Sequence, residues 1–365
     1  MLASGGTYAL TRADDPASAT GTTGTSVATN GQTTSAPKVV QAAANAPDWA
    51  ATAAAVAPSV VAITVESDQG SGQGSGVIFD SAGHIVTNNH VVSGAGSGAA
   101  LTVTLNDSRS YPATVVGTDP ATDLAVIKLR TVPKDLKPIS LGNDNDLSVG
   151  DPVMAVGNPL GLAGTVTTGI VSALNRPVTT QAQEQPTDPF GRQSAAADTV
   201  VTNAVQTSAA INPGNSGGAL VDANGLLVGI NSSIAQLGGT GGQGGNIGIG
   251  FAIPVNEAKS IADQLIKSGK AEHAFLGVSS QDATVKDGGA SRAAAQLTAV
   301  TPGSAAAQAG LQAGDSIVAV DGEPIDGSLS LVAQIRERSV GTQAKLTVIR
   351  DGQRQDVTVT LGRKA

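Results

Sequence analysis

Residues 211–220 read Ile-Asn-Pro-Gly-Asn-Ser-Gly-Gly-Ala-Leu, and this stretch decides the fold. Ser216 stands among glycines, which reach backbone angles closed to other residues and allow a tight turn that exposes its hydroxyl. A serine that attacks a carbonyl also needs N–H donors for the oxyanion that forms. We therefore predict an oxyanion hole at Gly214, Asn215 and Ser216, with the N–H groups of Gly214 and Ser216 as donors.

A serine hydroxyl becomes a good nucleophile when a neighbouring base takes its proton and a third group orients that base. The chain has three histidines, at positions 84, 90 and 273. His90 follows an apolar strand-like run, and Asp123 stands at the start of another, residues 124–129. The candidate catalytic residues are therefore His90, Asp123 and Ser216. Because the histidines share no ligand spacing, we expect no metal and no cofactor; His84 is expected in a solvated turn and His273 on the surface.

The order of these three residues separates two folds that both place a serine between glycines. The nucleophile elbow of α/β-hydrolases carries its residues in the order Ser, acid, His and leads from a strand into a helix. Here Ser216 comes last, and it is followed by two apolar runs, 219–221 and 226–230, around an Asn-Gly turn that indicates a β-hairpin. The order His-Asp-Ser therefore favours an all-β protease fold over the elbow.

Four segments in chain order resemble the HtrA (DegP/DegS-like) serine proteases: residues 87–92, 123–126, 212–218 and 248–254. Together with the C-terminal part, the resemblance covers roughly residues 55–363. It implies an all-β chymotrypsin-like double β-barrel protease domain followed by an α+β PDZ domain. It also implies a serine endopeptidase that works outside the cytoplasm.

The chain divides by composition into four predicted parts. Residues 1–46 have few large apolar side chains, so we expect a disordered tether. Residues 47–254 form the predicted protease domain, which begins with a short Ala-rich helix beside Trp49, the one tryptophan. Residues 255–272 carry apolar side chains at helical spacing and are predicted to be a linker helix. Residues 273–365 are the predicted PDZ domain.

Short apolar runs separated by Gly, Asn and Asp turns predict the strands of a first barrel near 75–79, 84–88, 101–105, 110–117 and 124–129. Residues 177–197 are polar and contain three prolines, which predicts a long exposed loop. By its position the loop resembles the regulatory loop of HtrA proteases; a passive insertion is the alternative. The glycine-rich residues 234–246 predict a mobile loop, and phosphate binding is rejected because no Lys-[Ser/Thr] follows.

The substrate pocket is predicted from positions relative to the nucleophile in this fold. Ala210 falls at the base of the specificity pocket, next to Ile211, so no carboxylate is present to pair with a substrate Lys or Arg. Residues Ile230, Asn231 and Ser232 are expected to supply the strand that pairs with the substrate backbone. The aliphatic surroundings favour a small apolar side chain, such as Val or Ala, at the cleavage site.

The C-terminal part shows the pattern strand, strand, short helix, strand, helix, hairpin, and resembles a PDZ domain. Residues Phe275, Leu276, Gly277 and Val278 stand where such a domain has its carboxylate-binding loop. A peptide would pair with the exposed sheet edge while free N–H groups hold its C-terminal carboxylate.

Composition limits the remaining function classes. The formal net charge of −8 provides no basic surface for nucleic acid. With 2% aromatic residues, the core must consist mainly of Val, Ile, Leu and Ala. We expect no membrane-spanning run within this sequence and an export or anchor segment outside it. The resemblance implies a homo-trimer or larger assembly, with Trp49 either covering the barrel edge or contacting a second subunit.

The sequence thus predicts an ATP-independent serine endopeptidase for unfolded or misfolded envelope proteins, with a PDZ domain that binds exposed C-termini. Unfolded chains can adopt the extended conformation that both sites require, whereas folded chains cannot. The alternative is a peptide-binding chaperone or scaffold whose protease domain is disordered at rest.

Overall fold

The computed structural model describes residues 47–67, 70–94, 99–158, 164–180, 200–212, 214–233 and 248–363. The predicted tether, the glycine-rich loop and residues 181–197 of the predicted long loop lie outside this part. The first described element is helix α1, Trp49–Val56, which Asp48 caps by accepting the Ala51 N–H at 3.0 Å. The turn η1, Ala57–Ser59, contains Pro58 and leads the chain into the first strand.

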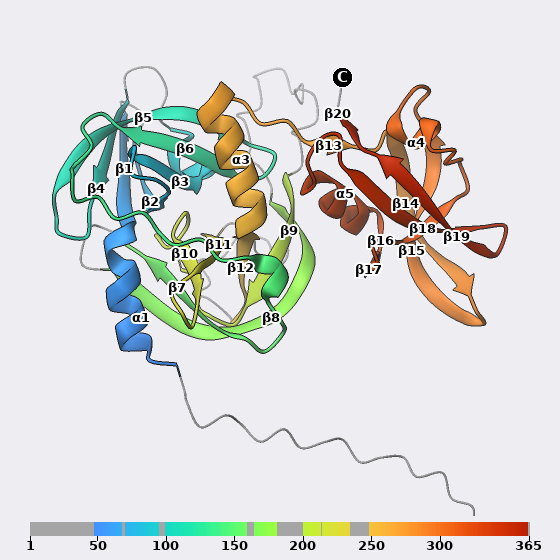
Figure 1. The fold of residues 1–365 in the computed structure, drawn as a ribbon, viewed down its shortest axis with the longest axis horizontal. Coiled ribbons are helices and arrows are strands. Elements are labelled where there is room, and N and C mark those ends of the chain that lie inside the picture. The colour runs from blue at the N-terminus through green and yellow to red at the C-terminus, as the bar shows by residue number, and fades with distance from the viewer. Residues whose placement is uncertain are drawn as a thin grey trace, which may run out of the picture. The chain divides into compact units, whose positions relative to one another are not determined.

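Six strands form a first closed barrel in the order β1-β2-β3-β6-β5-β4 (Figure 1). The bounds of β3, β4, β5 and β6 lie within two residues of those expected from the apolar runs and turns, whereas β2 begins at Gly70, five residues before the expected start at 75. Between β3 and β4 the chain makes a single helical turn, α2, Asn89–Val92. The strands are β1 Val60–Ser67, β2 Gly70–Ile78, β3 His84–Asn88, β4 Ala100–Thr104, β5 Ser110–Asp119 and β6 Leu124–Leu129.

Six further strands form a second closed barrel in the order β10-β11-β12-β9-β8-β7. The turn η2, Asp144–Asp146, precedes it, and the predicted hairpin after Ser216 is the pair β10 and β11. The strands are β7 Pro152–Gly157, β8 Thr165–Thr180, β9 Val200–Thr207, β10 Ala219–Asp222, β11 Leu227–Ser232 and β12 Gly250–Pro254. Two six-stranded barrels confirm the predicted double β-barrel.

Strand β8 corrects one predicted boundary, since residues 177–180 belong to it and not to a loop. The first part of β8 pairs with β7 up to Ile170, and beyond Val171 it pairs, among the described strands, only with β9. A proline lacks the N–H that a strand with two neighbours would need, but it is tolerated where one edge is free. Pro177 lies in this one-sided part, which is why proline does not end the strand here.

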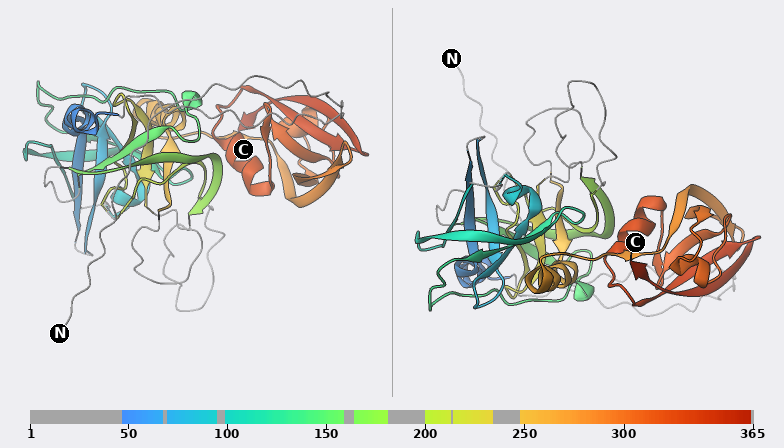
Figure 2. Two further views of the ribbon diagram at one scale, coloured as in Figure 1. Left: turned by 90° about the horizontal axis from the view of Figure 1, so that it is seen from below. Right: turned by 90° about the horizontal axis from the view of Figure 1, so that it is seen from above.

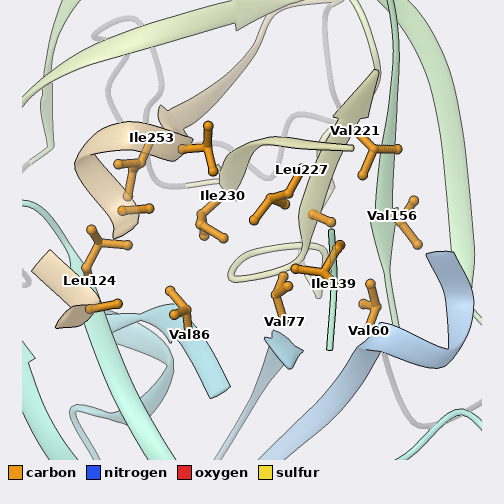
Figure 3. Packing of buried hydrophobic residues seen from close by; sticks show 14 of the residues in the cluster. Val60, Val77, Val86, Leu124, Ile139, Val156, Val221, Leu227, Ile230 and Ile253 are labelled. Carbon is orange, nitrogen blue, oxygen red and sulfur yellow. The ribbon is translucent and has the colours of Figure 1, made fainter. Parts of the chain in front are cut away.

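The two barrels share a core of aliphatic side chains, as the composition requires (Figure 3). Val77, Val86 and Leu124 come from the first barrel, whereas Ile230 and Ile253 come from the second, and all five are at most 2% exposed. Helix α3, Val255–Ser268, follows β12 and contacts β5 and β6 as well as β11 and β12 (Figures 1 and 2). The predicted linker helix 255–272 is thus shorter than expected, because it ends at Gly269, whose φ of 73° lies in the left-handed region that glycine favours.

The C-terminal domain is α+β and matches the predicted order of elements. Its main sheet has the order β14-β15-β16-β18-β19, with β17 paired to β16 and a separate pair β13-β20. The elements are β13 Ala274–Phe275, β14 Val278–Asp287, β15 Ala290–Val300, α4 Ala305–Gln308, β16 Ser316–Val320, β17 Glu323–Pro324, α5 Ser328–Arg336, β18 Gln343–Arg350, β19 Gln353–Thr360 and β20 Gly362–Arg363.

Two histidines lie in surroundings that differ from the prediction. His84 is 8% exposed, and its Nδ1 lies 2.6 Å from Asp80 Oδ2, so it is a buried partner of the turn and not a solvated residue. His273 is half-buried, with its Nε2 2.9 Å from an oxygen of the buried Asp119. Both expectations were wrong because exposure depends on neighbours that the local sequence does not reveal. Among the helices described, none has the length and apolar character needed to cross a membrane.

Candidate active site

His90 and Asp123 are brought together by a strand end and a single helical turn. His90 lies in α2, directly after β3, and Asp123 lies just before β6, the strand that pairs with β3. The Nδ1 of His90 is 2.8 Å from Asp123 Oδ2, and the other carboxylate oxygen accepts the backbone N–H of His90 at 3.0 Å. The carboxylate therefore orients both the ring and the backbone of the same residue. With the proton held at Nδ1, the Nε2 of His90 is left as the basic nitrogen.

The backbone of Asp123 is itself specialised for this position. Its φ is 58°, in the left-handed region that aspartate tolerates better than most residues. Its carbonyl accepts the Asn89 N–H at 2.9 Å and the Asn88 side-chain amide at 3.1 Å. Asp123 is 6% exposed, so water provides little competition for its carboxylate. On the second barrel, Ser232 Oγ reaches Asp123 Oδ2 at a long 3.5 Å.

Ser216 lies in the turn before β10 and is 3% exposed. Its Oγ accepts the backbone N–H of Ser233 at 3.0 Å and is also hydrogen-bonded to the Ser233 hydroxyl. Within the described ranges, no hydrogen bond joins Ser216 Oγ to His90. The base is thus paired with its acid, while the hydroxyl of the candidate nucleophile is held by a different residue.

The turn around Ser216 leaves two backbone donors without a hydrogen bond to any described residue. These are the N–H groups of Gly214 and Ser216, whereas the Asn215 N–H donates to the Asn212 carbonyl at 3.0 Å. Of the three residues predicted for the oxyanion hole, Asn215 therefore has its backbone donor occupied. Gly214 adopts a φ of 96°, which explains the need for glycine there.

Ser75, on strand β2, connects the first barrel to this turn, and the sequence contained no signal for it. Its Oγ donates to the Gly214 carbonyl at 2.6 Å and accepts the Asn158 N–H at 2.8 Å. Its backbone N–H donates to the Ser216 carbonyl at 2.8 Å. A Cβ at Gly217 would collide with the carbonyl oxygen of Ser75, so glycine allows the close approach of the two segments. A serine among the glycines and small polar residues of β2 matches no motif, and only the folded structure shows this role.

The residues predicted for the substrate pocket do not all lie at one surface. The Ile230 side chain is in the core between the barrels (Figure 3), and its backbone pairs with both β10 and β12. Asn231 is likewise bonded on both sides, since its N–H donates to the Gly218 carbonyl and its side chain to the Ala219 carbonyl, while on the other side it pairs with Ala252 of β12. Ile211 is 7% exposed within the core of the second barrel. Ala210 is half-buried, and Ser232 pairs only with Phe251, so its other backbone edge is free among the described strands.

The predicted carboxylate-binding loop lies between β13 and β14. Gly277 has a φ of 83°, and a Cβ there would collide with Ser304. The carbonyls of Leu276 and Gly277 accept the N–H groups of Ala306 and Thr301, both at 2.9 Å. The N–H groups of Leu276 and Gly277 donate to no described residue. Phe275 is 37% exposed, and Val278 begins β14, the edge strand of the sheet.

Across the described residues, no three His, Cys, Asp or Glu side chains come together in a way that could hold a metal ion. The candidate site offers the side chains of His90, Asp123 and Ser216 and the backbone N–H groups of Gly214 and Ser216.

Comparison with known proteins connects both domains to described families. The model of the trypsin-like peptidase domain matches residues 74–230, and the model of the PDZ domain matches residues 274–361. The chain is 48% identical over 321 residues to the serine protease PepD of Mycobacterium tuberculosis, covering 85% of this chain and 65% of that protein. It is 41% identical over 293 residues to the periplasmic serine endoprotease DegP of Escherichia coli, covering 79% of this chain and 56% of that protein. The chain thus spans less than two thirds of the length of these curated relatives.

Solved structures provide a match over nearly the whole of a related chain. The HtrA-type protease AlgW, solved with a tripeptide, is 33% identical to this chain and superposes with a TM-score of 0.61. The match covers 87% of this chain and 98% of the AlgW chain. It therefore includes both the double barrel and the PDZ domain.

Proposed function

Because this chain belongs to the HtrA family of serine proteases, we propose that it is an ATP-independent serine endopeptidase that degrades unfolded or misfolded extracytoplasmic proteins. Its catalytic triad is His90, Asp123 and Ser216. The observation that carries this proposal is the contact of both carboxylate oxygens of Asp123 with His90, one with its ring and one with its backbone N–H. Gly217, directly after Ser216, lies against Thr87 and Asn88 just before His90, and the N–H groups of Gly214 and Ser216 donate to no described residue.

In the proposed reaction, the Ser216 hydroxyl turns to His90 and attacks the substrate carbonyl while Nε2 of His90 takes its proton. Asp123 keeps the imidazole in the required tautomer and stabilises its positive charge. The N–H groups of Gly214 and Ser216 stabilise the oxyanion. His90 then passes the proton to the leaving amine, and water, activated by the same base, releases the acyl group from Ser216.

The PDZ domain is proposed to bind exposed C-terminal peptides of substrate proteins. Two observations support this: the N–H groups of Leu276 and Gly277 donate to no described residue, and no described strand pairs with the outer edge of β14. Such a site accepts an extended chain by strand addition. A cellular location outside the cytoplasm is proposed because relatives are named periplasmic proteases. A homo-trimer or larger assembly is proposed from the family resemblance.

The second candidate function is a peptide-binding chaperone or scaffold whose protease domain does not turn over at rest. One observation favours it, namely that the Ser216 hydroxyl is bonded to Ser233 and not to His90.

Casein digestion by the wild type and by Ser216→Ala separates the two functions. For an endopeptidase, the substitution should lower turnover by several orders of magnitude, because the nucleophile is lost. Ser81→Ala is a matched control, since Ser81 is exposed in a turn of the first barrel and should digest casein as the wild type does. Equal digestion by the wild type and Ser216→Ala would rule out the endopeptidase.

A further inference from the structure

Ser233 contacts the candidate nucleophile through two different groups. It directly follows β11, one residue beyond Ser232, and is only partly exposed. Its N–H donates to Ser216 Oγ at 3.0 Å, and its hydroxyl is hydrogen-bonded to the same oxygen. Neither contact has a role in the reaction proposed above, in which the Ser216 hydroxyl must donate to His90.

The donors and lone pairs at the contact between Ser216 and Ser233 determine how it affects the reactivity of Ser216. A serine hydroxyl has one proton to donate and two lone pairs that accept. The Ser233 N–H already uses one lone pair of Ser216 Oγ. If the Ser216 hydroxyl donates to Ser233, its proton points away from the base. If the Ser233 hydroxyl donates instead, both lone pairs of Ser216 Oγ are engaged and none is free to attack. Either direction lowers the reactivity of Ser216.

The segments that carry the two serines are fixed relative to each other just before the contact. The Asn231 N–H donates to the Gly218 carbonyl at 2.9 Å, and the Gly217 N–H donates to the Asn231 carbonyl at 2.9 Å. These two bonds lie directly after Ser216 in one segment and two residues before Ser233 in the other. These backbone hydrogen bonds hold the two segments close enough for the hydroxyls to meet. Rotation of one of the two serine side chains is enough to break the contact between the hydroxyls.

Of the two contacts that Ser233 makes, only the one from its side chain depends on the type of residue at this position. Any residue except proline at this position would present an N–H to Ser216 Oγ, but only a hydroxyl-bearing side chain adds the second contact. We propose that Ser233 is a positioning residue that holds the Ser216 hydroxyl away from His90 and limits the reactivity of the protease at rest. The proposal rests on the proposed function, since it assigns Ser216 as the nucleophile.

The reactivity of Ser216 can be measured without a peptide substrate by using diisopropyl fluorophosphate. In this reaction Ser216 Oγ forms a bond to phosphorus, the P–F bond breaks, fluoride leaves and His90 takes the hydroxyl proton. The second-order rate constant is read from the mass increase of the intact full-length chain. The variants are Ser233→Ala, Ser233→Thr, Ser216→Ala as the unreactive reference and Ser81→Ala as the control.

Ser233→Ala should be labelled about three- to tenfold faster than the wild type, the range expected when one neutral hydrogen bond is removed. Ser233→Thr keeps the hydroxyl and should return the rate to that of the wild type, whereas a merely structural role for the side chain would not produce an increase followed by rescue. Melting temperatures of all variants, measured in the same buffer, show that each is folded.

The other outcomes overturn one proposal or both. If the wild type is labelled and digests casein but Ser233→Ala is labelled no faster, Ser233 does not restrain the nucleophile, and only this inference is lost. If neither the wild type nor any variant is labelled or digests casein, Ser216 is not a nucleophile, and the proposed function fails together with the inference.

Discussion

The carboxylate of Asp123 serves two acceptor roles at once, and this limits what can replace it. One oxygen accepts the His90 ring proton at 2.8 Å, and the other accepts the His90 backbone N–H at 3.0 Å. An asparagine has a single carbonyl oxygen and an amide group that only donates. Its carbonyl oxygen can therefore accept either the ring N–H or the backbone N–H of His90. Its NH2 group would then face the other N–H, and two donors cannot form a hydrogen bond.

Asp123→Asn is expected to lower kcat/KM for casein by about 10⁴-fold, the size of effect known when a triad aspartate becomes asparagine and the histidine tautomer changes. Steady-state digestion of casein, together with a thermal melt, checks this. Asp146→Asn is the matched control, because Asp146 is exposed in η2, and it should retain wild-type kinetics. A loss smaller than tenfold would mean that Asp123 does not orient the base.

Ser75 and Ser216 show why local motifs describe only part of the site. In the sequence, the glycines around Ser216 predict a tight turn. The three hydrogen bonds that Ser75 provides to that turn and to Asn158 join segments far apart in the chain. No pattern in residues 70–78 distinguishes Ser75 from the other small polar residues of that run.

Helix α3 carries a buried carboxyl group, that of Glu257. Glu257 lies in its first turn and is 5% exposed, and its Oε2 has no hydrogen-bond partner among the described atoms. Burial raises the pKa of Glu257 well above its usual range, and the negative charges of Glu337, Asp119 and Asp144 act in the same direction. Folding therefore favours the protonated form of this carboxyl.

Glu257→Gln should stabilise the folded protein at neutral pH and make its stability less dependent on pH. Because the folded-state pKa is raised, the carboxyl contributes fully below its unfolded value of 4.5, and the contribution is lost as the pH rises toward the folded value. The stability difference between variant and wild type should thus increase with pH above about 4.5. Urea unfolding at a series of pH values from acid to neutral measures it.

Glu66→Gln is a suitable control for this measurement, since Glu66 lies exposed near the end of β1. Its stability difference from the wild type should change much less with pH than that of Glu257→Gln. If the stability difference between Glu257→Gln and the wild type is the same at all pH values, the pKa of this carboxyl does not differ between the folded and unfolded states.

Strand β8 shows where predictions of element boundaries fail. The prolines after residue 176 favoured a loop, but β8 continues to Thr180 because its second half has a neighbour on one side only. Whether a strand has one neighbour or two is a property of the sheet, and it decides whether a proline is tolerated.

At the scale of the whole molecule, a protease domain and a PDZ domain occur in one chain and are both proposed to use extended peptides. The free N–H groups of Leu276 and Gly277 and the open edge of β14 favour a peptide that ends in a free carboxylate. Hydrogen bonds to a charged group are worth about 1.5–3 kcal/mol, which corresponds to about tenfold or more in affinity.

A fluorescent peptide with an apolar C-terminal residue and a free carboxylate is therefore expected to bind at least about tenfold more tightly than the same peptide as a C-terminal amide. Fluorescence anisotropy with the full-length Ser216→Ala protein measures both affinities without cleavage. Gly277→Ala should weaken binding because its Cβ collides with Ser304, whereas Gly288→Ala has open space around its Cβ and should bind as the parent does. Equal affinities for the acid and amide peptides would contradict carboxylate recognition.

Local sequence patterns were enough to predict strands of the first barrel, helix α3 and the α+β order of the C-terminal domain. Alternation of apolar residues, turn glycines and helical spacing act over a few neighbouring residues, which is why these elements could be predicted. The order of the candidate triad is read directly from the sequence, whereas the double barrel was implied by the resemblance to HtrA proteases. The folded structure was needed to show which group holds the Ser216 hydroxyl, that Ile230 faces the core, that His84 and Glu257 are buried, and that His273 is half-buried against Asp119. The reason is physical: burial and hydrogen-bond partners depend on how separate segments of the chain pack together, and local sequence patterns do not contain that information.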